Sequence, residues 1–173
     1  KPNLVQTIEK VPAFVHGGPF ANIAHGTSSL IATKLALKLA DYIVTEAGFG
    51  SELGAEKFFD IVCRVGNLKP DAVVMVVSIK ALKRHGHGKD ISAVKKGLSN
   101  LEKHLENISL FGVPLIIAIN HYTDDKDEEL DVVEKFCKAK NIGCAVADIW
   151  GQGGEGGIEL AGKLVSIIHN NPS

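Results

Sequence analysis

The sequence predicts an α/β fold with a mostly parallel sheet and helices on both faces. Two uncharged runs rich in β-branched residues, 72–79 and 115–120, lack the alternation of a half-exposed strand and are typical of strands buried on both faces. Amphipathic helical patterns lie between the strand-like segments, and Gly-rich turns separate them. Such alternation of strand and helix is typical of a parallel sheet with right-handed crossovers.

The first part of the chain begins with apolar residues at positions 4, 5 and 8, whose spacing indicates a short opening helix or turn. Farther on, Ile31, Leu35 and Leu39 share one face of a helical pattern, and Ile43 and Val44 form a short β-branched run before a Gly-rich turn. The next expected elements are, in order, a strand at 11–15, a helix at 30–40, a strand at 42–45 and a helix at 54–62.

The second part continues the alternation. Pro70 and Asp71 interrupt the chain before the first buried strand, and Gly112 and Pro114 do so before the second. The expected elements are, in order, a strand at 72–79, a loop at 80–88, a helix at 90–108, a strand at 115–120, a loop at 121–126, a helix at 127–140, a strand at 144–147, a loop at 150–157 and a helix at 158–169.

Composition narrows the classes of function. A chain of 173 residues is long enough for one domain that buries roughly 70% of its unfolded surface, so we expect a single α/β domain over residues 1–173. A formal net charge of −1 gives no electrostatic reason to expect nucleic acid or a membrane surface as a partner, and no apolar run reaches the ~18 residues of a membrane span. The three cysteines have no CxxC spacing and indicate reduced thiols of a cytoplasmic protein rather than a disulfide framework or a zinc site.

Five loops are expected at one edge of the sheet, because parallel strands all end on the same side. Four of them carry one aromatic ring each, although only 6% of the residues are aromatic. Two or three such rings can sandwich a flat heteroaromatic ligand, and each stacking contact adds ~1 kcal/mol beyond burial. Alternatively, each ring covers only its own loop. The loops are 16–27, 46–51, 80–88, 120–125 and 148–157, and the rings are those of Phe20, Phe49, Tyr122 and Trp150.

Other groups in these loops are weaker candidates. His85 and His87 have poor spacing for shared metal ligation, so no bound metal is expected there. The glycines at 151–157 could wrap a phosphate with backbone N–H groups, but they lack the Lys-Ser/Thr ending of a P-loop. Lys80 and Lys83 could neutralise an anion, although a solvated basic face explains them equally well.

Several longer segments carry a family resemblance. They are PNLVQTIE at 2–9, VHGGPFANIAHG at 15–26, ATKLALKLADYIVTEAGFGSELGAEKF at 32–58, NLEKHLENI at 100–108 and WGQGGEGG at 150–157. In this order they resemble formate–tetrahydrofolate ligases over essentially the whole chain. The resemblance implies an α/β core like that of P-loop NTPases, present in part. It also implies an enzyme that joins formate, MgATP and tetrahydrofolate through formyl phosphate to give 10-formyltetrahydrofolate, ADP and phosphate.

The resemblance implies roles for five residues and assigns no catalytic residue to the chain. By position, Tyr122 and Trp150 match the two aromatic residues that hold the folate pterin, with Tyr122 in place of the family's usual Phe. Ala21, Phe49 and Gly54 match positions that line the neighbouring pocket for formyl phosphate and nucleotide.

The chain departs from the family pattern after the first buried strand. The family signature VAT(I/V)RALKxHGG maps onto residues 76–87, where Val77, Ser78, Lys80 and His87 replace Ala, Thr, Arg and Gly. The segment that follows, 88–98, is shorter than in bacterial members. These departures leave the detailed role of this loop open.

The resemblance further implies the central portion of a larger cytoplasmic enzyme that assembles as a homotetramer. Its substrates would be MgATP, formate and tetrahydrofolate, with a monovalent cation as a further candidate and no tightly bound metal. The family's P-loop lies N-terminal to the matched stretch, so the isolated chain is expected to be inactive. One alternative stays open, a stand-alone folate-binding or regulatory module without turnover. An unrelated α/β nucleotide-binding domain is disfavoured, because no GxGxxG follows a strand.

Overall fold

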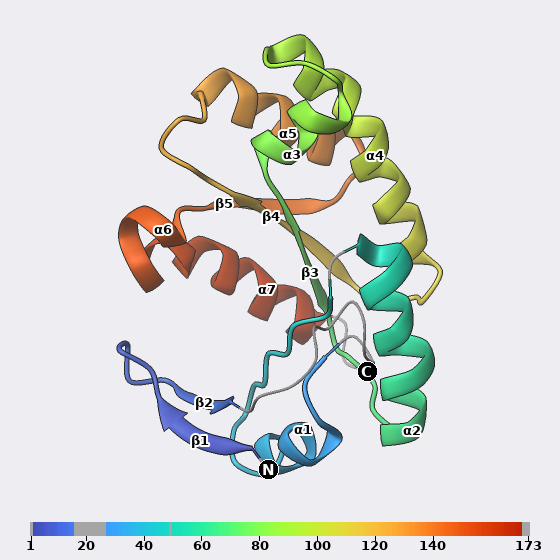
Figure 1. Cartoon of the computed structure of the whole chain (residues 1–173), viewed down its shortest axis with the longest axis vertical. Helices are drawn as coiled ribbons and strands as arrows, with labels where there is room; N and C mark the ends of the chain where they lie inside the picture. Colours follow the sequence, from blue (N-terminus) through green and yellow to red (C-terminus); the bar gives the residue numbers. More distant parts are fainter. Residues whose placement is uncertain (1, 16–26, 49, 171–173) are drawn as a thin grey trace. The chain divides into compact units, whose positions relative to one another are not determined.

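The computed structural model describes residues 2–15, 27–48 and 50–170. The chain forms two compact units, Lys1–Lys69 and Pro70–Ser173, which are described separately (Figure 1). The second unit holds a parallel three-stranded sheet flanked by helices, so the predicted α/β class is confirmed. Within the described residues, no helix is long and apolar enough to cross a membrane.

The sheet of the second unit has the strand order β3-β4-β5. These strands are β3 (Val73–Val77), β4 (Leu115–Asn120) and β5 (Gly143–Ala147). Each coincides with a predicted strand to within two residues at either end. The predicted burial on both faces holds for the central strand β4 but is wrong for β3, which lies at the edge of the sheet and has Val76 67% exposed. The register pairs Met75 with Ile117 and Ile117 with Cys144.

Helices cover both faces of this sheet. Ile117 and Ile119 belong to a core formed with α3 (Ile79–His85), α4 (Ile91–Ser109) and α5 (Asp127–Ala139). Ile116 and Ala118 alternate with them and therefore point to the opposite face, where α7 (Ile158–Asn170) packs against β4 and β5. Two short elements, α6 (Ile149–Gln152) and a 3₁₀ helix (Gly153–Gly157), connect β5 to α7.

The first helix after β3 replaces the loop that the sequence predicts at 80–88. The lysines, histidines and glycines of residues 80–88 are typical of a loop. However, Ile79 and Leu82 are completely or almost completely buried, which a helix allows. Ser78 starts the helix by accepting a hydrogen bond from the backbone N–H of Ala81 at 3.2 Å. The carbonyl of Leu82 would lie 2.1 Å from a Cβ at Gly97, so only glycine lets α3 and α4 approach this closely.

A buried ion pair joins α3 to α5. The Nζ of Lys83 lies 2.7 Å from each carboxylate oxygen of Glu129, whose side chain is 2% exposed. Glu129 also accepts a hydrogen bond from the backbone N–H of Lys126 at 3.4 Å, within the capping box of α5. The ion pair therefore fixes the start of α5, which directly follows the loop after β4.

The first unit is less regular. It contains the antiparallel hairpin of β1 (Asn3–Gln6) and β2 (Pro12–Val15), followed by α1 (Leu30–Ala36), π-helical segments at Gly50–Ala55 and Phe58–Cys63, and α2 (Arg64–Gly66). The strand at 11–15 and the helical character of 54–62 are confirmed.

Three predictions for this unit are wrong. The opening residues form β1 where a helix or turn was expected, because the turn lies later, at Thr7–Lys10, and closes a hairpin in which Leu4 pairs with Phe14. The predicted helix at 30–40 ends at Ala36. Residues 42–45 are not a strand: Val44 is 90% exposed, and no strand among the described residues pairs with it.

Candidate functional site

The carboxyl ends of β3, β4 and β5 meet at one edge of the sheet, as in other parallel sheets. Three of the five predicted loop regions therefore leave the sheet side by side, after Val77, Asn120 and Ala147. The other two, 16–27 and 46–51, belong to the first unit, and most of the former lies outside the described residues. The candidate site lies at the carboxyl edge of the three-stranded sheet.

Tyr122 lies in the turn that follows β4. Its backbone N–H donates to Oδ2 of Asp125 at 2.9 Å, and its carbonyl accepts from the N–H of Asp125 at 2.9 Å. At the other end of the side chain, Nδ2 of Asn120 donates to the phenolic oxygen at 3.1 Å. These bonds hold both ends of the residue, while 40% of it is exposed to solvent. The Tyr122 ring is therefore fixed and accessible.

Trp150 lies in α6, directly after β5, and is 82% exposed. Asp148 begins this helix: its Oδ1 accepts from the backbone N–H of Gly151 at 3.0 Å, and its Oδ2 accepts from Nε2 of Gln152 at 2.9 Å. So large an exposed aromatic surface needs an explanation, because Trp side chains are usually well buried. An aromatic ligand that stacks on the ring would provide one.

His121 connects the loops that carry the two rings. Its backbone N–H donates to the carbonyl of Ala147 at 3.1 Å, and its Nδ1 lies 3.6 Å from Oδ1 of Asp148. Its neighbour in the chain is Tyr122, and Trp150 lies two residues after Asp148. The structure thus brings Tyr122 and Trp150 onto adjacent, connected loops at the same edge of the sheet.

The pKa of the Asp148 carboxyl is lowered from its ordinary value. The largest cause is the hydrogen bond from Gln152, followed by the backbone hydrogen bond from Gly151, and His121 adds a smaller effect. Partial desolvation opposes these causes. Because the pKa is lowered, Asp148 stays ionised at neutral pH and keeps accepting hydrogen bonds.

The lysines and histidines that the sequence offered as weaker candidates lie in or next to α3. Lys83 pairs with Glu129, so it is neither a free anion-binding group nor part of a solvated basic face. Lys80 lies exposed at the start of α3. His85 ends α3, and His87 follows it with a positive φ of 56°. Among the residues that the structure describes, no three His, Cys, Asp or Glu side chains are grouped to hold a metal ion.

The glycines after β5 have a packing role. A Cβ at Gly151 would lie 2.7 Å from the carboxylate oxygens of Asp148, and one at Gly156 would lie 2.2 Å from its carbonyl oxygen. Moreover, the backbone N–H of Asp148 donates to the carbonyl of Gly156 at 3.2 Å. Close approach to Asp148 therefore explains these two glycines without a bound phosphate.

The residues that the resemblance places near formyl phosphate and nucleotide are described only in part. Ala21 and Phe49 lie outside the described residues. Gly54 is buried in the π-helical segment Gly50–Ala55, where a Cβ would lie 1.8 Å from the carbonyl oxygen of Gly48. The glycine is thus required by the packing of its own segment, and its role toward a ligand stays a prediction.

Two residues of this edge, His121 and Asp148, were missed by the sequence analysis. Each follows a buried strand directly, and Asp148 stands three residues before a glycine in the pattern of a helix cap. The local signal for a cap was therefore present. Their contact with each other depends on the register of β4 and β5, which the sequence does not reveal.

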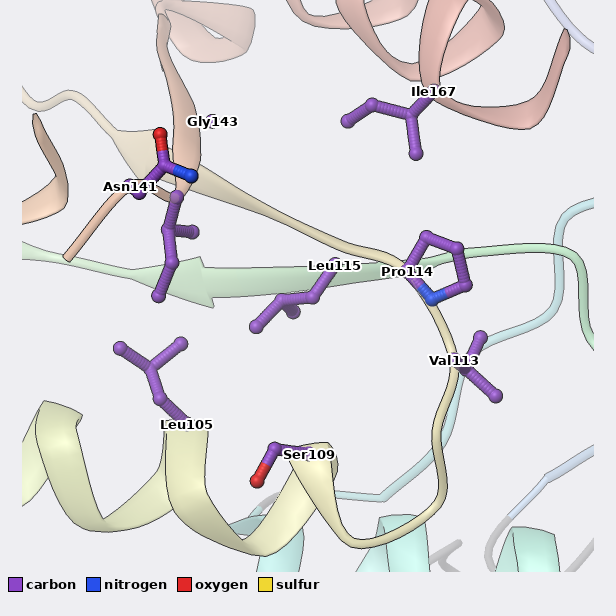
Figure 2. Close-up of a pocket in the computed structure, with 9 residues that line it drawn as sticks. Leu105, Ser109, Val113, Pro114, Leu115, Asn141, Gly143 and Ile167 are labelled. Atoms are coloured by element: carbon purple, nitrogen blue, oxygen red, sulfur yellow. The ribbon is translucent and has the colours of Figure 1, made fainter. Parts of the chain in front are cut away.

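Two cavities among the described residues of the second unit lie at the other end of the strands. The larger one measures about 410 Å³ and is bounded by Leu105 of α4 and Ile167 of α7, near the start of β4 (Figure 2). The second measures about 380 Å³ and lies at the start of β5, lined in part by Lys138 and Lys163. Neither includes a residue of the candidate site.

Comparison with known families agrees with the motifs of the sequence. The family model for formate–tetrahydrofolate ligase matches residues 1–173, the entire chain. The match includes the segments that carry Tyr122 and Trp150. The chain therefore belongs to the formate–tetrahydrofolate ligase family.

Proposed function

We propose that the chain is the folate-binding portion of an ATP-dependent ligase that forms 10-formyltetrahydrofolate from formate, ATP and tetrahydrofolate through formyl phosphate. The observation that carries the proposal is the pair of exposed rings, Tyr122 and Trp150, on adjacent loops at the carboxyl edge of the sheet. Ligands of α/β sheets bind at this edge. A pterin is a flat heteroaromatic ring system, which is the kind of ligand that two such rings bind by stacking.

The proposal includes the remaining expectations from the family. Ala21, Phe49 and Gly54 would line the pocket for formyl phosphate and nucleotide, and MgATP would be bound with the help of groups that these 173 residues lack. The natural enzyme would be a cytoplasmic homotetramer. The residues of this chain would then contribute folate binding, while the phosphoryl transfer would depend on the ATP loop.

The direct test of the folate site uses the single tryptophan of the chain. Tetrahydrofolate is expected to quench or shift the emission of Trp150 in a saturable manner, because stacking places the pterin against an otherwise solvated indole. The titration is measured by fluorescence, with N-acetyltryptophanamide as the control for the inner-filter effect. A signal that does not differ from this control would remove Trp150 from the site.

In an active enzyme that contains this chain, Tyr122→Ala is expected to raise the KM for tetrahydrofolate about tenfold, since loss of one stacking face costs roughly 1–2 kcal/mol. The KM for ATP should change much less. Tyr122→Phe is the matched control, because it keeps the ring and removes only the hydrogen bond from Asn120. Equal changes in both KM values for Tyr122→Ala would contradict the assignment.

A further inference from the structure

We infer that Asp148 is a positioning residue that sets the place of Trp150 relative to Tyr122. The inference rests on the proposed folate site, and it adds a residue that touches neither the pterin nor another substrate in that proposal. The contacts of Asp148 reach both ends of its own loop and the neighbouring loop.

Asp148 holds its own loop at three points. Its two carboxylate oxygens accept from Gly151 N–H at 3.0 Å and from Gln152 Nε2 at 2.9 Å. Its carbonyl accepts from the backbone N–H of Gln152 at 3.0 Å, and its own N–H donates to the carbonyl of Gly156 at 3.2 Å. Trp150 lies between the tethered positions. Its backbone is therefore fixed although its side chain is 82% exposed.

Both glycines lie close to Asp148, one to its side chain and one to its backbone. A Cβ at Gly151 would lie 2.7 Å from the carboxylate oxygens, and a Cβ at Gly156 would lie 2.2 Å from the carbonyl oxygen. The contacts with Gly156 involve only the backbone and are open to any residue at this position. The carboxylate is therefore what ties Gly151 and Gln152 to Asp148 in particular.

Asp148 also reaches the loop that carries Tyr122. Its Oδ1 lies 3.6 Å from Nδ1 of His121, and the backbone of His121 is itself hydrogen-bonded to Ala147, the residue before Asp148. Tyr122 follows His121 and is held in place by Asn120 and Asp125. One carboxylate therefore connects the two segments that present the rings. Stacking between two rings requires a fixed separation, which this connection provides.

The test compares four forms of the 173-residue chain: wild type, Asp148→Asn, Gln152→Leu and Asp90→Asn. Asp148→Asn keeps an oxygen that can accept from Gly151 N–H. This amide oxygen is a weaker acceptor toward His121 than the carboxylate, and the NH₂ group of the asparagine then faces Gln152. Gln152→Leu removes one tether without changing Asp148. Asp90→Asn is the matched control, since Asp90 caps α4 by the same kind of bond, from Ala93 N–H to Oδ1 at 3.1 Å, and does not touch the candidate site.

The first measurement is the steady-state anisotropy of Trp150 without ligand. Asp148→Asn is expected to lower it clearly and Gln152→Leu to lower it less, while Asp90→Asn leaves it unchanged. Far-UV circular dichroism verifies that each variant is folded. Unchanged anisotropy in both loop variants, or an equal loss in Asp90→Asn, would overturn the positioning role.

The second measurement is the Kd for tetrahydrofolate, taken from the emission of Trp150. Asp148→Asn is expected to raise the Kd about tenfold, comparable with the loss of one stacking face. A wild-type Kd in a variant with reduced anisotropy would overturn the role of Asp148 in the folate site. If wild type itself gives no folate signal while the anisotropy falls as expected, the proposed function fails and the positioning of Trp150 by Asp148 stands.

Discussion

Lys83→Met is expected to destabilise the unit Pro70–Ser173 by about 3 kcal/mol. Methionine keeps the aliphatic stem of the side chain but leaves the carboxylate of Glu129 without its cation. That carboxylate is 2% exposed, so water cannot replace the lost partner. Lys83 itself is 22% exposed, which places the expected loss at the lower end of the range for buried ion pairs.

Urea unfolding followed by circular dichroism measures this loss. Lys103→Met is the matched control, because the ion pair of Lys103 with Glu106 has side chains that are 70% and 59% exposed. The control should leave the free energy of unfolding almost unchanged, because solvent screens an exposed ion pair. Lys83→Met combined with Glu129→Leu should recover most of the loss, since both charges are then removed. A single variant as stable as wild type would contradict the structural role of the pair.

The 173-residue chain alone is expected to form no 10-formyltetrahydrofolate from formate, MgATP and tetrahydrofolate. Phosphoryl transfer from ATP needs a glycine-rich loop around the phosphates, a lysine and a hydroxyl that binds Mg²⁺. The nearest approach to that pattern is GIELAGKL at 157–164, which ends in Leu164 instead of Ser or Thr. Most of it lies inside α7, where Lys163 contacts Glu159 and the carbonyl of Cys144.

Release of ADP and formation of 10-formyltetrahydrofolate are measured together, with a complete family member as the positive control. Formate-dependent turnover by the chain alone would mean that its ATP site lies within these residues. Folate binding without turnover would fit both a portion of the enzyme and a stand-alone module. The mass of the natural gene product separates these two: about 18.4 kDa, the mass of the chain, supports the module, and a much larger mass supports the portion.

The sequence predicted the sheet of the second unit well and the first unit poorly. In β4, composition and burial give the same answer, because a long apolar run between amphipathic helices has few other stable arrangements. The run of β3 also forms a strand, but at the edge of the sheet, where Val76 is 67% exposed. The run at 42–45 is shorter, and glycines follow it. Its composition favours a strand, but no strand among the described residues pairs with it. A strand needs pairing that a local pattern cannot reveal.

The candidate site was predictable to the level of its loops. The sequence indicates the strands that precede Tyr122 and Trp150. Because these strands are parallel, the two residues are expected at the same edge of the sheet. The contact between His121 and Asp148 does not follow, because it depends on how two strands distant in sequence are aligned. Likewise, the pairing of Lys83 with Glu129 required a helix where composition favoured a loop.

The strand β3 has a consequence for how this polypeptide behaves in solution. Among the described residues it pairs with β4 alone, so its other edge has backbone N–H and C=O groups without a strand partner. The sequence of that edge, VVMVV, contains no charge and no proline, and Val76 is 67% exposed. These are the features that promote edge-to-edge aggregation of sheets. We therefore expect β3 to limit the solubility of the isolated polypeptide and Val76→Lys to raise it, because a charge on an edge strand opposes pairing with a second sheet.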